Sequence, residues 1–295
     1  MMKYSLPHPM KALEALRALY PDSSRRTLQN WLKAGRFTVD GNPILRENEE
    51  FQAGQVVAAA ASCKPQLVPG LKVLYEDRYL VAIDKQMGLL SVPLDDGITK
   101  RHALGMLRDH FETDQIYAVH RIDRETSGCL LFARGKEAEG KLKDLFEKHD
   151  LKRVYFAIVE GRMKEREGTW HSRLLELESL QVVESEEGRD AITHFTVLKH
   201  SPKYTYLKLT LETGRKHQIR VHCSAAGHPV LGDERYGSGE NPIRRMCLHA
   251  SHLELVHPFT GKLLKIDSPL PTAFKKLTTG FSSPLSSRGQ SAPRS

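Results

Sequence analysis

An aspartate between two arginines follows an apolar stretch in the segment His120-Arg-Ile-Asp-Arg-Glu-Thr-Ser-Gly128. Neighbouring cations favour the ionised form of a carboxylate, so Arg121 and Arg124 are expected to keep Asp123 charged. An ionised carboxylate in a loop can serve as a base or as a nucleophile. The same residues could equally form a structural salt bridge, and this segment alone does not decide between the two interpretations.

A tyrosine that could act beside this carboxylate stands in the segment Lys152-Arg-Val-Tyr-Phe-Ala-Ile-Val-Glu-Gly161. The alternation of a strand places Tyr155 on the same face as Ala157 and Val159. A buried tyrosine usually needs a partner for its hydroxyl group. Both a functional role and an ordinary place in the core therefore remain open for Tyr155.

A third segment, Leu211-Glu-Thr-Gly-Arg-Lys-His-Gln-Ile-Arg-Val-His222, is rich in cationic groups. We expect a helix that starts near His217 and carries Arg220 one turn inside. Arg215 and Lys216 lie on the loop before that helix. A guanidinium in the position of Arg220 could hold a carboxylate by two hydrogen bonds or bind phosphate. A solvated basic face is the alternative.

Metal and nucleotide chemistry are disfavoured by what the sequence lacks. His217 and His222 are five residues apart and His249 and His252 three apart, with no His-Glu-x-x-His motif and no cysteine pair. The Gly-rich phosphate loops and the Gly-x-Ser-x-Gly turn of serine hydrolases are also missing. We expect no metal and no cofactor.

The composition indicates a folded protein with a polyanionic partner. The 295 residues are 40% hydrophobic and 27% charged, with a formal net charge of +8, which favours nucleic acid over an acidic membrane surface. Four scattered cysteines indicate reduced buried thiols rather than a disulfide framework: Cys63, Cys129, Cys223 and Cys247. The sequence shows no membrane span and no secretory signal, so we expect a cytoplasmic protein.

The residues around the three segments predict an α+β body. Strand patterns occur at 73–75, 79–83, 116–122, 129–133, 153–159, 192–198 and 204–211. Amphipathic helices are predicted around 104–111, 138–146 and 217–226, and Gly227 supplies the usual cap for the last of them. Irregular alternation of this kind is typical of the α+β class.

The first sixty residues predict a separate unit of two helices and short strands. The first helix is indicated by Met10, Leu13, Leu16 and Leu19, and the second by Leu28, Trp31 and Leu32. A strand from Phe37 runs into an Asp-Gly turn. The second helix also carries a basic face, made of Arg25, Arg26, Lys33 and Arg36.

Taken in order, the three segments resemble the RluA family of pseudouridine synthases. Residues 120–128 are similar to that family's His-Arg-Leu-Asp-x-x-Thr-Ser-Gly motif, with Ile122 in place of leucine. Residues 214–222 are similar to Gly-Arg-Thr-His-Gln-Ile-Arg-Val-His, with Lys216 in place of threonine. The resemblance covers about residues 71 to 272. In one departure Gln86 replaces the proline of Lys-Pro-x-Gly-Leu, which should loosen a backbone turn.

This resemblance implies that a uridine in RNA has its base detached from C1′ through N1, rotated, and rejoined through C5, without a cofactor. It implies that Asp123 is the catalytic carboxylate, which either attacks the nucleotide or takes the C2′ proton. Arg220 would pair with Asp123. Tyr155 would pack on the uracil and is a candidate to remove the C5 proton.

The same resemblance implies contacts with RNA around the site. A base inside a helix cannot be reached, so the uridine must be flipped out, and Arg121 matches the arginine that fills the vacated stack. Arg124, Arg215 and Lys216 are further expected RNA contacts. His217 and Gln218 are expected to support the site rather than to act on the substrate.

Residues 10 to 60 resemble an S4 RNA-binding domain, and the basic face of Arg25, Arg26, Lys33 and Arg36 would bind RNA phosphates. We therefore expect an S4-like domain at 1–64, a pseudouridine synthase catalytic domain at 65–280 and a disordered basic tail at 281–295. The expected fold class is α+β, with a mixed, largely antiparallel sheet in the catalytic domain after a small α/β domain.

The leading hypothesis is an RNA pseudouridine synthase that acts on structured RNA. Large-subunit ribosomal RNA is the favoured substrate, because family members with an S4-like domain commonly act there, and transfer RNA is the alternative. A non-catalytic RNA-binding or ribosome-assembly protein would not need Asp123, Tyr155 and Arg220 together. A metal-dependent nuclease lacks the ligand spacing it requires. We expect no membrane partner and a monomer.

Overall fold

A computed structural model describes residues 3–21, 23, 25–33, 37–44, 46–59, 67–68, 71–94 and 101–283. The chain divides into two compact units: Met1–Val73 with Met106–Gln115, and Leu74–Gly105 with Ile116–Ser295. The domain boundary expected at residue 64 and most of the expected tail, 284–295, lie outside the described residues.

The first unit combines two whole helices, and the end of a third that begins in the second unit, with short antiparallel strands. Its elements are β1 (Lys3–Ser5), β2 (Met10–Lys11), α1 (Ala12–Leu19), α2 (Arg25–Lys33), β3 (Phe37–Val39), β4 (Asn42–Pro43), β5 (Glu50–Phe51), β6 (Val56–Ala59), β7 (Leu67–Val68) and the start of β8 (Leu71–Glu76). The main sheet has the order β1-β6-β3-β4, while β2 pairs with β5 and β7 with β8. The Asp40–Gly41 turn expected between β3 and β4 is present, with positive φ at both residues.

Most of the apolar residues predicted on the first two helices form the core of this unit, whereas Met10 lies on β2 and not on α1. Leu16 and Leu28 are buried, and Trp31 makes an edge-to-face contact with Tyr20 at a centroid distance of 5.2 Å. Helix α1 begins where the Glu14 carboxylate accepts a hydrogen bond from the backbone N–H of Lys11 at 3.2 Å. The helices therefore follow directly from apolar periodicity and local capping.

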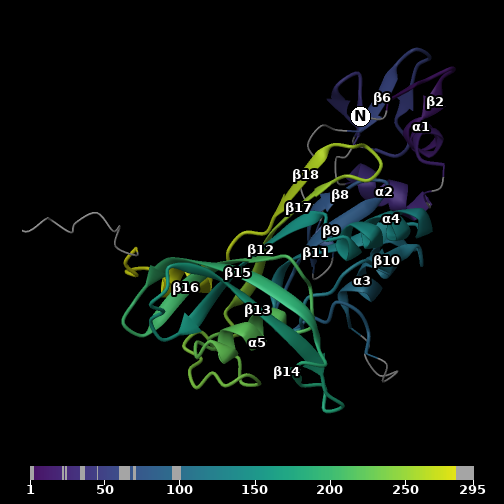
Figure 1. The fold of residues 1–295 in the computed structure, drawn as a ribbon. Helices are drawn as coiled ribbons and strands as arrows, with labels where there is room; N and C mark the ends of the chain where they lie inside the picture. Colours follow the sequence, from purple (N-terminus) through teal and green to yellow (C-terminus); the bar gives the residue numbers. More distant parts are fainter. Residues whose placement is uncertain are drawn as a thin grey trace, which may run out of the picture. The chain divides into compact units, whose positions relative to one another are not determined.

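The second unit is built on one mixed, largely antiparallel sheet, as the sequence predicted. Its remaining elements are β9 (Leu80–Lys85), the first residues of α3 (Ala103–Phe111), β10 (Ile116–Ala118), β11 (Ser127–Arg134), α4 (Lys136–Glu147), β12 (Leu151–Glu160), β13 (Glu167–Glu176), β14 (Val182–Glu184), β15 (Arg189–His200), β16 (Tyr204–Leu211), α5 (Gln218–Ala225), β17 (Leu248–Val256), β18 (Leu263–Asp267) and α6 (Thr272–Leu277). The strand order is β14-β13-β15-β16-β12-β17-β11-β9-β8, with β10 beside β11 and β18 beside β17 (Figure 1). Only β11 and β17 pair in parallel among the strand pairings described.

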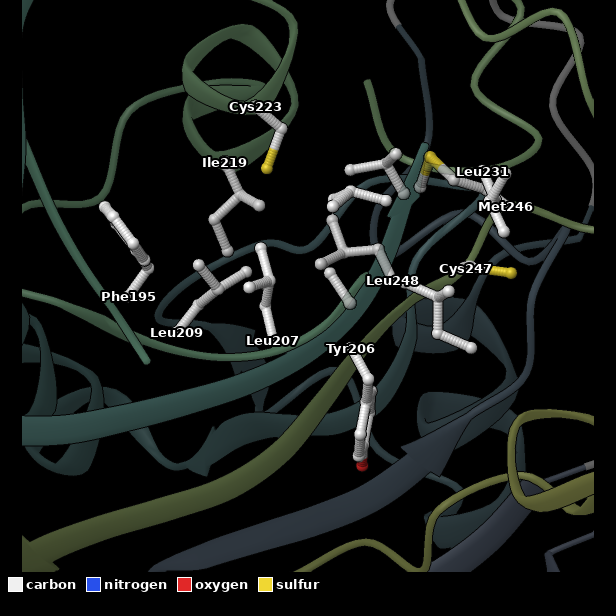
Figure 2. Packing of buried hydrophobic residues seen from close by; sticks show 14 of the residues in the cluster. Phe195, Tyr206, Leu207, Leu209, Ile219, Cys223, Leu231, Met246, Cys247 and Leu248 are labelled. Atoms are coloured by element: carbon white, nitrogen blue, oxygen red, sulfur yellow. The ribbon is translucent and has the colours of Figure 1, made fainter. Parts of the chain in front are cut away.

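Helix α5 packs its apolar side onto this sheet. Figure 2 shows Ile219 and Cys223 extending from the helix toward Leu207 and Leu209 of β16, and all four residues are buried. Residues four apart lie on one side of a helix, so this packing fixes the rotation of α5 about its axis. The predicted end of the helix is confirmed by Gly227, which has a φ of +78°.

The strand predicted at 116–122 is shorter in the structure, because β10 ends at Ala118. Beyond Ala118, β11 forms a hydrogen bond with a side chain instead: the backbone N–H of Leu131 donates to Nε2 of His120 at 3.0 Å. The His120 ring also stacks on Phe146, with centroids 4.4 Å apart. The imidazole of His120 thus accepts the hydrogen bond that a backbone carbonyl of a continuing strand would accept. The chain therefore leaves the sheet before it reaches Asp123.

Candidate active site

The loop that carries Asp123 is tied by its backbone on both sides. On one side, the Ser91 hydroxyl donates to the carbonyl of Ile122 at 2.7 Å and accepts from its N–H at 3.3 Å. On the other side, the carbonyl of Arg124 accepts a hydrogen bond from the N–H of Gly88 at 2.7 Å. The Asp123 side chain is 22% exposed. The carboxylate therefore lies on a fixed loop and is open to solvent.

A buried lysine that sequence reasoning missed also holds this loop. The Lys85 ammonium donates to the carbonyls of Gln86, Leu89 and Arg124 at 3.1, 2.7 and 3.1 Å. Burial lowers the pKa of Lys85 to about 8, while the nearby charge of Asp123 opposes that shift. The carbonyl of Gln86, the residue that replaces the family's proline, is one of these three acceptors.

Gly128 ends the loop at the closest approach of two strands. It pairs in parallel with Ala250 of β17, and its φ is +114°. A Cβ on Gly128 would lie 2.0 Å from the carbonyl oxygen of Ala250. The glycine of the Thr-Ser-Gly sequence is therefore required by both backbone conformation and space.

Arg220 connects Asp123 to a second, buried carboxylate. Its Nη1 donates to Oδ2 of Asp123 at 3.2 Å, while Nε and Nη2 donate to the two oxygens of Asp233 at 2.6 and 2.7 Å. These ion pairs raise the pKa of Arg220 even though burial opposes the charged form. Arg220 thus supplies a fixed positive charge beside Asp123. Asp233 was not among the residues that the sequence singled out.

His217 lies beside the same carboxylate at the start of α5. Its Nε2 is 3.9 Å from Oδ1 of Asp123, and its Nδ1 is 2.7 Å from the hydroxyl of Tyr236. That hydroxyl accepts a hydrogen bond from the N–H of Val182 at 3.0 Å. Burial lowers the pKa of His217, and the charge of Asp123 partly offsets this. Burial therefore disfavours the protonated form of this imidazole.

Gln218 anchors the loop before α5, which agrees with its expected supporting role. Its side-chain oxygen accepts hydrogen bonds from the Thr213 hydroxyl and the Arg215 N–H, both at 2.9 Å. Its amide nitrogen donates to the carbonyl of Ile192 on β15 at 3.0 Å. The amide joins this loop to the sheet, so Arg220 projects from a rigid base.

Tyr155 faces the side of the sheet that α5 covers. It lies opposite the buried Leu209 in the antiparallel pairing of β12 with β16, and directly opposed residues share a face. Its hydroxyl has no hydrogen-bond partner among the described residues. Burial raises the pKa of Tyr155 to about 12, with the Asp123 charge adding to the rise and Arg153 opposing it. The phenol is neutral near pH 7.

The cations expected to contact RNA differ in their surroundings. Arg121 is exposed, and the exposed Arg124 pairs with Glu125 at 2.8 Å rather than with Asp123. Nε of Arg215 donates to the carbonyl of Asp190 at 2.9 Å, and Lys216 pairs with Glu176. The cation beside Asp123 is therefore Arg220, and not the adjacent arginines that the local pattern suggested.

In the first unit, Arg25 is exposed at the start of α2. The side chains of Arg26 and Lys33, and the whole of Arg36, lie outside the described residues. The described cysteines, Cys129, Cys223 and Cys247, are buried and free, and Cys63 is not among them. Within the described parts of the chain, no His, Cys, Asp and Glu side chains gather as a metal site would require. The helices found there are all too short or too polar to cross a membrane.

On this largely antiparallel sheet the buried Arg220 contacts the partly exposed Asp123, which is the pairing that the resemblance implied. The family model described as RNA pseudouridylate synthase matches residues 79–225. The chain belongs to this family of RNA pseudouridine synthases, and its resemblance to the RluA family is confirmed.

Relatives and solved structures agree with this membership. An uncharacterized RNA pseudouridine synthase of Bacillus subtilis, YhcT, is 34% identical over 86% of this chain and 88% of its own length. Ribosomal large subunit pseudouridine synthase D of Pseudomonas aeruginosa is 34% identical over 87% of each chain. The solved structure of human RNA pseudouridylate synthase domain containing 1 matches with a TM-score of 0.60 at 26% identity, covering 76% of this chain and 94% of that one.

Proposed function

We propose that this enzyme converts uridines of large-subunit ribosomal RNA to pseudouridine, with Asp123 as its catalytic carboxylate. The observation that carries the proposal is the contact between Asp123 and Arg220, which come from motifs 97 residues apart. A binding protein has no need to place a buried guanidinium against a solvent-open carboxylate. The relative named for the ribosomal large subunit supports this choice of RNA.

The chemistry gives each group a role. Breaking the bond between N1 and C1′ builds positive charge on the sugar, and an adjacent carboxylate stabilises that charge. Asp123 does this either by attacking the nucleotide or by taking the C2′ proton. Arg220 orients Asp123, and Tyr155 packs on the flipped uracil and removes the C5 proton. The exposed Arg121 fills the space that the base leaves.

The first unit supports a second part of the proposal. It has the helices and the Asp-Gly turn expected of an S4-like domain, and Arg25 is exposed on α2. A cationic helix face of this kind binds RNA phosphates. As part of the same proposal, the enzyme acts as a monomer in the cytoplasm, with Asp123, Tyr155 and Arg220 supplied by one chain.

Mapping pseudouridines in ribosomal and transfer RNA tests this function. Cells without the gene should lose pseudouridine at one or more sites of the large-subunit RNA. The wild-type gene should restore them, as should Asp190→Ala, which removes an exposed carboxylate that pairs with His171. Asp123→Ala should not. Loss confined to transfer RNA would move the substrate to that RNA, and restoration by Asp123→Ala would contradict the catalytic assignment.

A further inference from the structure

Two polar groups without partners lie on one face of β12. Nε of Arg153 is buried and has no hydrogen-bond partner. Two residues further along, the Tyr155 hydroxyl also lacks one among the residues that the structure describes. Arg153 lies opposite Leu211 and Tyr155 opposite Leu209 in the uninterrupted pairing with β16. The two side chains therefore share the face toward α5, with Cα atoms about 7 Å apart.

The Arg153 guanidinium is held in place by the loop that precedes α5. Its Nη2 donates to the carbonyl of Glu212 at 3.0 Å. A Cβ on Gly214 would lie 2.3 Å from Nη1, so the loop packs directly on the guanidinium. The position of this charge is thus coupled to the segment that carries Arg220.

No carboxylate in the described structure pairs with Arg153. The Glu212 carboxylate, next to the carbonyl that Arg153 binds, instead contacts Nε2 of His194 at 2.6 Å. Burial lowers the pKa of Arg153, and the charge of Tyr155 as a phenolate opposes that shift. A buried cation without a counter-ion is costly, so its presence calls for an anion that forms during function.

We propose that Arg153 is a positioning residue that stabilises a transient phenolate of Tyr155, through which Tyr155 moves a proton from C5 to N1 of the uracil. This rests on the proposed function, in which Tyr155 contacts the flipped base. The proposal adds the counter-ion that this step requires and a source for the proton at N1.

The proton balance closes without any other reactant. Once C5 is bonded to C1′, C5 carries both the sugar and its hydrogen, and N1 shares a double bond with C6. The phenol gives its proton to N1 and becomes a phenolate beside Arg153. The phenolate then takes the hydrogen from C5. The C5–H electron pair forms the C5–C6 double bond, the C6–N1 pair returns to N1, and the phenol is restored.

The resting state of Tyr155 agrees with this order of events. Burial raises the pKa of Tyr155 to about 12 and Arg153 opposes the rise, so the enzyme starts with a neutral phenol. A neutral phenol must donate before it can accept. Arg153 contributes at the moment when negative charge appears on the oxygen, which is where fixed charges lower a reaction barrier.

A double-mutant cycle tests the proposal, with tritium release from RNA labelled at uridine C5 as the assay. Arg153→Met should lower kcat about 100-fold and leave KM for the RNA within about twofold. Arg153→Lys should recover part of the rate. Adding Arg153→Met to Tyr155→Phe should cost nothing further, because the phenolate is already absent. Lys152→Met, which removes the exposed neighbouring cation, is the matched control and should keep the wild-type kcat.

Several results would overturn this role. A raised KM with unchanged kcat would make Arg153 an RNA-phosphate ligand. Additive losses in the double variant would separate Arg153 from Tyr155. A fall in thermal stability with no recovery in Arg153→Lys would leave only a structural role. An unchanged kcat in Tyr155→Phe would remove the role of Tyr155 as well, whereas the test of Asp123 would stand independently.

Discussion

The guanidinium of Arg220 donates two hydrogen bonds to the buried carboxylate of Asp233, from Nε to Oδ2 at 2.6 Å and from Nη2 to Oδ1 at 2.7 Å. This contact fixes the direction of the third nitrogen, Nη1, which donates to Asp123. A carboxylate with no exposed side-chain surface thus orients the group that contacts the solvent-open one. The position of Arg220 beside Asp123 therefore depends on the Asp233 carboxylate, which is buried and does not contact the substrate.

Asp233→Asn should therefore weaken both the fold and the reaction. Removing one partner of a buried ion pair leaves Arg220 without its main counter-ion, which typically costs about 3–5 kcal/mol. Denaturant unfolding measures this loss, and tritium release should show a lower kcat. In the control Asp190→Asn, an exposed carboxylate is lost, and stability should change by less than about 1 kcal/mol. Equal stability of the two variants would contradict the role given to Asp233.

Gly128→Ala should prevent the parallel approach of β11 to β17. The methyl group would overlap the Ala250 carbonyl, and a positive φ disfavours any side chain, so we expect a loss of at least about 3 kcal/mol. Gly140→Ala is the matched control, because nothing lies within 4 Å of its Cβ position on α4. That change should stabilise the protein by about 0.5–1 kcal/mol. Thermal unfolding distinguishes the two, and equal melting temperatures would refute the steric argument.

Because His120 has a lowered pKa in the folded protein, we expect the free energy of unfolding to fall in mild acid. Burial and the charge of Arg153 lower the pKa of His120 to about 3, whereas a histidine in the unfolded chain titrates near 6.5. A lowered folded pKa gives stability that is complete above pH 6.5 and is lost as the pH falls toward 3. Between pH 7 and 5 the loss is about 2 kcal/mol. Urea unfolding should show this fall in wild type relative to His120→Gln, and parallel curves would count against it.

The proposed RNA-binding face of α2 predicts a change in salt dependence. Arg25→Glu combined with Arg26→Glu should lower RNA affinity, and the slope of log K against log salt should become shallower by about 0.7–0.9 for each phosphate that is no longer neutralised. Arg17→Glu alters another exposed arginine, on α1, and should leave the slope near that of wild type. Filter binding across a salt series measures both. If the double variant keeps the wild-type slope, α2 does not bind the RNA.

The sequence pattern predicted many of the helices and turns correctly, because these elements depend on residues that are close together in the sequence. Apolar spacing located α1, α2 and α5, and the Asp40–Gly41 turn follows from the two positive φ angles that Asp-Gly tolerates. The strand end at Ala118 was missed, because it depends on a hydrogen bond between His120 and Leu131. No periodicity reports a contact between a side chain and a distant backbone group.

The sequence motifs predicted the residues of the site itself, but not the residues that hold them in place. Asp123 and Arg220 stood in recognisable segments, but Lys85, Asp233 and Arg153 act through burial, which the sequence does not display. The local pattern assigned the charge beside Asp123 to its flanking arginines, whereas the fold brings Arg220 from 97 residues away. Each of these three residues is a charged side chain that is buried. Burial depends on how the sheet packs, so it is known only from the folded structure.

The catalytic role of Asp123 is tested most directly by comparing Asp123→Asn with wild type in tritium release from RNA labelled at uridine C5. The substitution keeps the shape of the side chain and removes its charge and basicity. We expect release to slow by at least about 10³-fold while the variant still binds the RNA, and Asp150→Asn, which changes an exposed aspartate, should match wild type. Release by Asp123→Asn at the wild-type rate would show that Asp123 is not the catalytic carboxylate.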